Sequence, residues 1–191
     1  TGWNRRMFWS DTERPWAMPS PNMPTLDTAL VYPGMCLFEG TKLSEGRGTT
    51  RPFEICGAPY VDAEKLVANM HELDLPGVRF RPYSFEPTFQ KHAREVCHGL
   101  HFHVTDREKF RSVETTFHLL RILWRNHGQE VAWQDPPYEY VWDRRPIDLL
   151  TGDQELTSWI EENGSEHLLQ QRLQDDAANW MTERKPFLLY S

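Results

Sequence analysis

The stretch DAEKLVANMHELDLPGVRFRP, residues 62–82, combines a helical pattern and a strand pattern on either side of a Pro-Gly turn. Asp62 is a suitable N-cap, and the apolar residues that follow recur on one helical face: Leu66, Val67, Met70 and Leu73. Residues 78–82 form a short apolar-rich run bounded by glycine and proline, which is typical of a strand. The stretch therefore predicts a helix over residues 63–73 and a strand directly after it.

The same alternation continues beyond this stretch. Residues 88–96 predict a short helix and residues 100–104 a second strand. Residues 110–126 predict the clearest helix of the chain, because apolar side chains recur at helical spacing: Phe117, Leu120, Leu123 and Trp124. Alternating helices and strands favour helices layered over a small mixed sheet. The predicted fold class is therefore α/β (α+β), a small mixed sheet flanked by helices.

The carboxyl-terminal part has a mainly helical pattern. Helices are predicted over residues 147–150, 153–161 and 165–180. The last helix carries an apolar stripe that we expect to be buried: Leu168, Leu169, Leu173, Ala177 and Trp180. Residues 188–190 are predicted to pair as a closing strand.

The amino-terminal part is rich in proline and tryptophan. Residues 15–24 contain four prolines and predict a stiff, extended connector. Thr25 is a suitable N-cap for a helix over residues 26–30, which Pro33-Gly34 should kink or end. Two interpretations fit the tryptophans of this part: a sugar-stacking platform, or the preferred one, a cover over the core. They are Trp3, Trp9 and Trp16.

Composition excludes several classes of protein. The 191 residues contain 21 basic and 28 acidic side chains, which argues against a nucleic-acid-binding face. No apolar run approaches the roughly 20 residues that span a bilayer, so no membrane span is predicted. Three cysteines are too few for a disulfide framework, and their number is odd. We expect buried thiols, with a single disulfide as the alternative: Cys36, Cys56 and Cys97. Because the chain starts at Thr1, we expect a further segment upstream.

A second stretch, EGTKLSEGRGTTRPFE at residues 39–54, mixes glycines, cations, carboxylates and hydroxyls. Gly46 and Gly48 bracket Arg47, so the backbone there can adopt positive φ or approach another group closely. Arg47 and Arg51 can each bind a carboxylate through two parallel hydrogen bonds. The alternative is a glycine-rich surface loop with weak ion pairs. A phosphate loop is disfavoured, since the Gly-x-x-x-x-Gly-Lys-Ser/Thr order is absent.

Several motifs together resemble one known family, DUF1343, also called the NamZ exo-β-N-acetylmuramidases. The motifs are Ser-Pro-Asn-Met-Pro-Thr (20–25), Ala-Leu-Val-Tyr-Pro-Gly (29–34), the glycine-rich stretch (38–54), Leu-Pro-Gly-Val-Arg-Phe (75–80), Pro-Thr-Phe-x-Lys (87–91), His-Val-Thr-Asp (103–106), Ile-Asp-Leu-Leu-Thr-Gly (147–152) and Phe-Leu-Leu-Tyr (187–190). The resemblance covers essentially the whole chain but only the carboxyl half of the family.

The resemblance implies a two-lobed protein. A Rossmann-like amino-terminal lobe carries the proposed catalytic glutamate in a Gly-Pro-Glu-His-Gly stretch, which does not occur here. We therefore expect residues 1–191 to be a single domain equivalent to the carboxyl-terminal lobe, present as a fragment or processed product and inactive alone. The implied reaction removes β-1,4-linked N-acetylmuramic acid from the non-reducing end of bacterial peptidoglycan fragments, without a cofactor, in the periplasm or outside the cell.

The resemblance also directs the choice of site residues. Arg47 and Arg51 are predicted to bind the lactyl carboxylate of muramic acid. Glycosidases usually employ two carboxyl groups, and Glu45, or secondly Glu39, is predicted to supply one of them across an interlobe cleft. Further substrate contacts are expected from Ser44, Thr49, Thr50, Asn22, Tyr83, Lys91, His103 and Asp148.

No metal site is predicted from the histidines of residues 98–103, because nothing supplies a third convergent ligand and its supporting hydrogen bonds. Two other functions stay open at this point. In the first, the chain is a module that binds acidic amino sugars without cleaving them. In the second, it is a structural lobe that touches no ligand.

Overall fold

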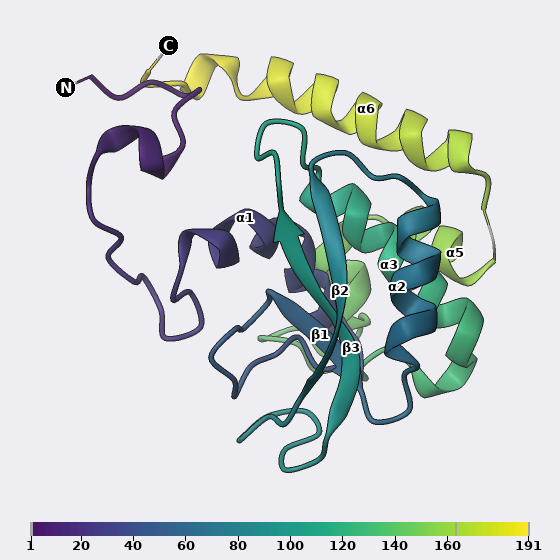
Figure 1. The fold of residues 1–191 in the computed structure, drawn as a ribbon. Coiled ribbons are helices and arrows are strands. Elements are labelled where there is room, and N and C mark those ends of the chain that lie inside the picture. Colours follow the sequence, from purple (N-terminus) through teal and green to yellow (C-terminus); the bar gives the residue numbers. More distant parts are fainter. Residues whose placement is uncertain (1, 163, 191) are drawn as a thin grey trace.

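The computed structural model describes residues 2–162 and 164–190, and its centre is a small antiparallel sheet (Figure 1). Three strands, β1 (Ile55–Ala58), β2 (Val78–Phe85) and β3 (Cys97–Val104), pair in the order β1-β3-β2. The register places His101 of β3 between Ile55 of β1 and Arg81 of β2. His101, on the central strand, therefore has a residue of β1 beside it on one side and a residue of β2 on the other.

The helices are α1 (Leu26–Met35), α2 (Ala63–Glu72), α3 (Ser112–His127), α4 (Pro146–Thr151), α5 (Gln154–Glu161) and α6 (Glu166–Glu183), with short 3-10 turns at Trp9–Thr12, Cys36–Gly40, Gly128–Glu130 and Lys185–Phe187. As predicted, Asp62 caps α2 by accepting a hydrogen bond from the Lys65 N–H at 3.0 Å. Thr25 caps α1 in the same way through the Thr28 N–H. The α/β fold class predicted from the sequence is confirmed.

The two faces of the sheet have opposite character. Successive side chains in a strand point to opposite sides. One face is part of the hydrophobic core and is covered by α2, on which α3 packs in turn: Cys56, Ala58, Val78, Phe80, Leu100 and Phe102. On the other face, Arg79, Arg81 and His103 are exposed. The second face is therefore polar and exposed only in part, because Ile55, Phe85 and Cys97 form a small buried cluster at its other end.

The predicted mixed sheet is wrong, because all strand pairs are antiparallel. Residues 88–96 were expected to be helical, but they form only turns and bends. A parallel return requires a crossover of about a dozen or more residues, usually through a helix. Without that helix, β3 runs back along β2. The strand β1 was not predicted, since Ile55–Ala58 is short and contains glycine and alanine.

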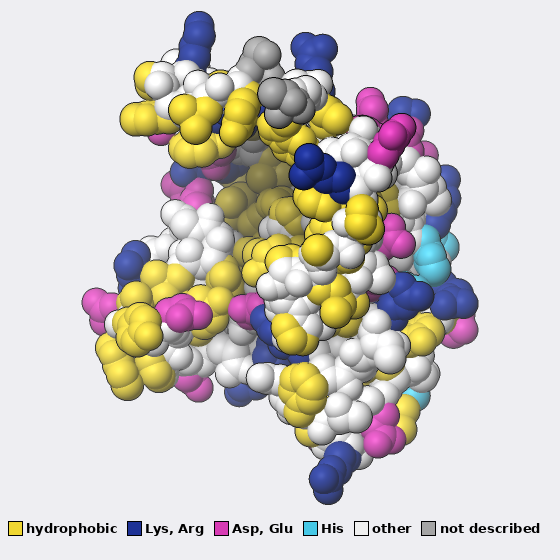
Figure 2. Space-filling view, turned by 90° about the vertical axis from the view of Figure 1, so that its left-hand side faces the viewer, with side chains coloured by type: hydrophobic (Ala, Val, Ile, Leu, Met, Phe, Trp, Pro, Cys, Tyr) yellow, Lys and Arg dark blue, Asp and Glu magenta, His cyan; other side chains and the backbone are white. Residues whose placement is uncertain are grey.

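The apolar stripe of α6 is largely exposed, contrary to the sequence-based prediction. Leu169 is fully buried, whereas Leu168 and Trp180 are 46% and 59% exposed. Figure 1 shows that α6 runs across the top of the molecule towards the two termini, and only its first two turns, with Leu169 and Leu173, pack against the core. The strand expected at residues 188–190 does not form. Figure 2 shows apolar side chains around the hollow below this part of the molecule.

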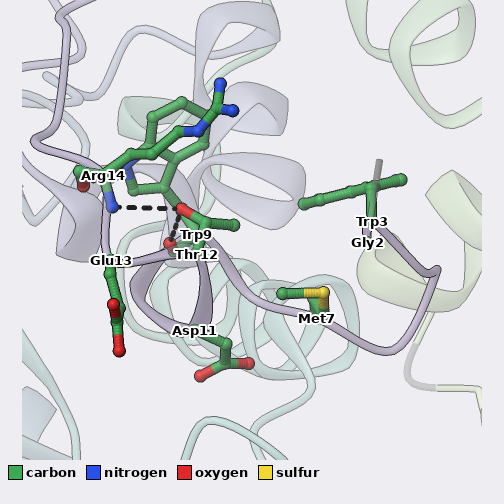
Figure 3. A pocket seen from close by; sticks show the side chains of 8 residues that line it. All are labelled: Gly2, Trp3, Met7, Trp9, Asp11, Thr12, Glu13 and Arg14. Carbon is green, nitrogen blue, oxygen red and sulfur yellow. Dashed lines mark hydrogen bonds between the residues drawn. The ribbon is translucent and has the colours of Figure 1, made fainter.

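The tryptophans of the amino-terminal segment do not cover the core. Trp3 is 47% exposed, and Trp9 packs edge-to-face on Trp16 with ring centroids 5.7 Å apart. Figure 3 shows Trp3 and Met7 standing across a pocket from Trp9. The core closes over α1, α2, α3 and α5 without these side chains. Among the described helices, none combines the length and apolarity needed to cross a bilayer.

Candidate functional site

The loop formed by residues 41–54 positions two groups of polar residues. Its glycines are required by the backbone: Gly46 has φ +77° and Gly48 has φ +83°. A Cβ atom on Gly48 would lie 2.7 Å from the Phe89 carbonyl oxygen, so the loop passes directly against the β2–β3 connection. The prediction of positive φ or close approach at these glycines is confirmed on both counts.

The first group surrounds a half-buried lysine. Lys91 Nζ donates hydrogen bonds to the backbone carbonyls of Phe38 and Leu43, at 2.8 and 3.1 Å, and to Glu45 Oε2 at 2.9 Å. Burial lowers the pKa of Lys91, and the negative charge of Glu45 opposes that change. We call this group the Lys91 cluster; its members are Glu39, Glu45, Arg47, Lys91 and Tyr138.

The same cluster contains a second cation. Arg47 Nη2 lies 2.6 Å from Glu39 Oε1, and Arg47 Nε lies 3.3 Å from Glu45 Oε1. Tyr138 donates from its hydroxyl to Glu39 Oε2 at 2.8 Å, and its pKa is raised by burial and by this carboxylate. Two carboxylates therefore face two cations, which balances the buried charge. Chemically, the cluster is a closed network that holds the loop in place.

The second group begins at Glu54, a buried carboxylate at the end of the loop. Its Oε1 accepts hydrogen bonds from the hydroxyls of Thr25 and Thr28, at 2.6 and 2.5 Å. Its Oε2 lies 3.1 Å from Arg51 Nη1 and 3.7 Å from His101 Nε2. Burial raises the pKa of Glu54, but the bonds from His101, Thr25 and Thr28 and the charge of Arg51 outweigh burial and lower this pKa to about 2.

The group continues across the open sheet face. Arg81 Nη2 lies 3.3 Å from His101 Nδ1, and the Arg81 guanidinium lies 5.4 Å from the Tyr83 ring centroid. The rings of His101 and His103 are 4.2 Å apart. Burial, together with nearby His101 and Arg81, lowers the pKa of His103. We call this set the sheet-face group: Arg51, Glu54, Arg81, Tyr83, His101 and His103.

The structure brings some predicted site residues together and leaves others apart. Glu39, Glu45, Arg47 and Lys91 meet in the Lys91 cluster, and Arg51, Tyr83 and His103 meet in the sheet-face group. Ser44 and Thr49 use their hydroxyls inside the loop, on Gly46. Thr50 is exposed.

Two further predicted residues lie in other local structures. Asp148 accepts a two-point hydrogen bond from Arg145, at 3.0 and 3.1 Å, in the first turn of α4. Asn22 donates from its backbone to the Ser20 hydroxyl. Within residues 2–162 and 164–190, no hydrogen bond or ion pair joins either residue to the two groups.

Sequence reasoning missed the contribution of Arg81 and His101 to a site. A signal for both was present, since Arg79, Arg81 and Tyr83 alternate along one strand, as His101 and His103 do along the next. Only the register shows that Arg81 and His101 are direct partners. No three His, Cys, Asp or Glu side chains of the described residues are placed to hold a metal ion.

A small three-stranded antiparallel sheet packed against helices defines the class of protein as an α/β (α+β) domain. The particular family follows from comparison with known proteins. Residues 30–190 match the family model for the carboxyl-terminal part of exo-beta-N-acetylmuramidase NamZ. The chain belongs to this family, which confirms the resemblance seen in its motifs.

Individual relatives agree with the family model. Peptidoglycan beta-N-acetylmuramidase NamZ of Bacillus subtilis (strain 168) is 37% identical over 188 residues, which cover 98% of this chain and 44% of that protein. The crystal structure of a DUF1343 family protein from Bacteroides fragilis NCTC 9343 has a TM-score of 0.83 at 26% identity, over 100% of this chain and 49% of that one. A second DUF1343 protein of the same organism shares the fold, with TM-score 0.60, 24% identity, and 91% and 44% coverage. The chain therefore spans less than half the length of these relatives.

Proposed function

We propose that this chain is the substrate-binding, carboxyl-terminal lobe of an exo-β-N-acetylmuramidase, which removes N-acetylmuramic acid from the non-reducing end of peptidoglycan fragments. The observation that carries the proposal is the 37% identity, over 98% of this chain, to the peptidoglycan beta-N-acetylmuramidase of Bacillus subtilis. The reaction itself requires the amino-terminal part that this relative has in addition. The lobe described here contributes binding groups and a supporting carboxylate.

The two predicted arginines take different parts in this proposal. Arg51 is 44% exposed and uses Nη1 on Glu54, which leaves much of its guanidinium directed outward. Arg47 is 25% exposed, and Glu39 and Glu45 occupy its Nη2 and Nε. Arg51 therefore contacts the lactyl carboxylate of the sugar, whereas Arg47 holds the loop in the conformation that presents Arg51.

The same geometry ranks the two predicted catalytic carboxylates. Both carboxylates are held, Glu45 by Lys91 and Arg47 and Glu39 by Arg47 and Tyr138, but Glu45 is 3% exposed whereas Glu39 is 19% exposed. A carboxyl group that assists glycoside cleavage must reach the sugar. We therefore favour Glu39 over Glu45 as the carboxylate of this lobe nearest the reaction, with Glu45 acting through the position of Arg47.

The enzymatic proposal is tested with a chromogenic N-acetylmuramyl glycoside. The 191 residues alone should release no product, whereas the chain joined behind the amino-terminal half of the Bacillus subtilis relative should release it. In that joined protein, Arg51→Ala should reduce kcat/KM by about tenfold or more, the loss expected for a charge-assisted hydrogen bond. Arg125→Ala, at an exposed position of α3, is the matched control.

Each other outcome points to a different function. Turnover by the 191 residues alone would place the catalytic glutamate in this lobe. A folded joined protein without turnover, but with binding of N-acetylmuramic acid, would identify a non-catalytic binding module. Absence of both binding and turnover would identify a structural lobe. Since peptidoglycan lies outside the cytoplasmic membrane, we also infer that the protein acts in the periplasm or outside the cell; recovery of the protein in the cytoplasmic fraction would contradict this inference.

A further inference from the structure

We propose that the open sheet face is the receptor for the sugar's carboxylate, and that Arg81 is the residue that selects N-acetylmuramic acid over N-acetylglucosamine. The inference rests on the function proposed above, because these sugars differ only in the lactyl ether that carries the carboxylate. It adds to that function a specificity-determining residue that lies outside the glycine-rich loop.

Arg81 is an exposed arginine of this face whose guanidinium is held by two neighbouring rings, those of His101 and Tyr83. Its side chain is exposed, and within residues 2–162 and 164–190 no carboxylate lies within ion-pair distance of it. Of the other arginines of this face, Arg51 has a carboxylate oxygen of Glu54 at 3.1 Å, and Arg79, which likewise has no ion pair among these residues, donates to the backbone carbonyl of Val78 at 3.0 Å. An exposed guanidinium that is held in place by its neighbours and has no internal counter-charge is suited to bind an anionic ligand.

The neighbours of Arg81 hold its guanidinium in a defined plane. Its Nη2 lies 3.3 Å from His101 Nδ1, and the Tyr83 ring lies below the guanidinium at 5.4 Å. On the far side of the His101 ring, Nε2 lies 3.7 Å from Glu54 Oε2. A carboxylate beside Nε2 favours the proton on that nitrogen, so Nδ1 is free to accept from Arg81. The contacts from Glu54 to His101 and from His101 to Arg81 thus hold the Arg81 guanidinium in position before a ligand binds.

Further groups of the face suit a sugar that carries a carboxylate. Arg79 is paired with His103 in the sheet register, directly beside the Arg81 and His101 pair. Arg51 reaches the same area through Glu54, to which both Arg51 and His101 are bound. The half-buried Tyr83 ring adds an apolar surface on which a pyranose can pack. Positive donors and an aromatic ring therefore converge on one exposed area.

The test measures binding of three free sugars to the 191-residue chain by isothermal titration calorimetry. They are N-acetylmuramic acid, its methyl ester and N-acetylglucosamine. The wild-type chain should prefer the free acid over both neutral sugars by about tenfold or more, and Arg81→Gln should remove most of that preference, leaving only the part that Arg51 supplies. Arg125→Gln, an equal charge change on α3, should leave the preference intact. Because Arg81 is exposed, the variant should retain the wild-type unfolding midpoint.

A second readout localises the contact. In a two-dimensional NMR titration, the free acid should shift the ring resonances of His101 and His103 in the wild-type chain but not in Arg81→Gln. An unchanged preference for the acid in Arg81→Gln, or equal affinity of the folded wild-type chain for all three sugars, would overturn the inference. Neither result bears on turnover of the muramyl glycoside by the joined protein, so the proposed function stands or fails separately.

Discussion

The ammonium nitrogen of Lys91 lies 2.9 Å from a carboxylate oxygen of Glu45, which joins the connection between β2 and β3 to the loop that precedes β1. The same nitrogen donates to the backbone carbonyls of Phe38 and Leu43. One half-buried cation therefore binds three points of a chain segment that lies far away in the sequence. The conformation of the glycine-rich loop depends on this tertiary contact.

Replacing Lys91 tests this dependence. Lys91→Met should lower the free energy of unfolding by about 3–5 kcal/mol, because the buried Glu45 loses a counter-charge. Urea denaturation at pH 7 measures the change. Lys65→Met, at an exposed position of α2, should change it by less than about 0.5 kcal/mol. The double variant Lys91→Met with Glu45→Gln should recover part of the loss. A single-variant loss below about 1 kcal/mol would show that the cluster does not hold the loop.

Glu54 should make stability dependent on acid pH. The pKa of Glu54 is lowered from 4.5 to about 2 in the folded protein, so the unfolded state takes up the proton first as pH falls. The stabilisation, about 3 kcal/mol, is fully present above pH 4.5 and is lost as pH falls towards 2. The difference in unfolding free energy between wild type and Glu54→Gln should therefore be larger at pH 7 than at pH 3. If the difference in unfolding free energy between wild type and Glu54→Gln did not change with pH, the lowered pKa of Glu54 would be contradicted.

The glycine requirement of the loop can be separated into two parts. Gly152, which lies outside the loop at the end of α4, serves as the reference. It has φ +69° and nothing within 4 Å of an added Cβ atom, so Gly152→Ala should cost only the backbone strain, about 1–2 kcal/mol. Gly48→Ala adds the contact with Phe89 to a similar strain and should cost about 2–4 kcal/mol. Thermal unfolding of both variants measures the difference. Equal costs would mean that the loop can move away from Phe89.

The exposed stripe of α6 predicts opposite outcomes at two of its positions. Leu169→Ala should lower the free energy of unfolding by about 2–5 kcal/mol, since Leu169 is 0% exposed. Trp180→Ala should change it by less than about 0.5 kcal/mol, since Trp180 is 59% exposed. The two variants serve as controls for each other in the same denaturation experiment. A large loss from Trp180→Ala would show that this end of α6 packs against the body.

Much of the fold could be predicted from local sequence patterns. The helix after Asp62, the strand after Pro76-Gly77 and the long helix α3 all lie where their caps and periodicity place them. The errors arose where local pattern and tertiary packing differ. Residues 88–96 have a helical pattern, but Gly48 and Lys91 tie that connection to the loop by hydrogen bonds. The stripe of α6 is amphipathic, yet α6 extends past the body that would bury it.

The sequence by itself determined the family, the need for glycine at positions 46 and 48, and the types of residue available to a site. These properties depend on neighbouring residues and on backbone geometry. Only the tertiary structure decided which charges neutralise each other. Arg47 is satisfied by Glu39 and Glu45, whereas the strand register places Arg81 beside a histidine and away from carboxylates. Charge pairing falls off with distance through space, and sequence separation carries no information about that distance.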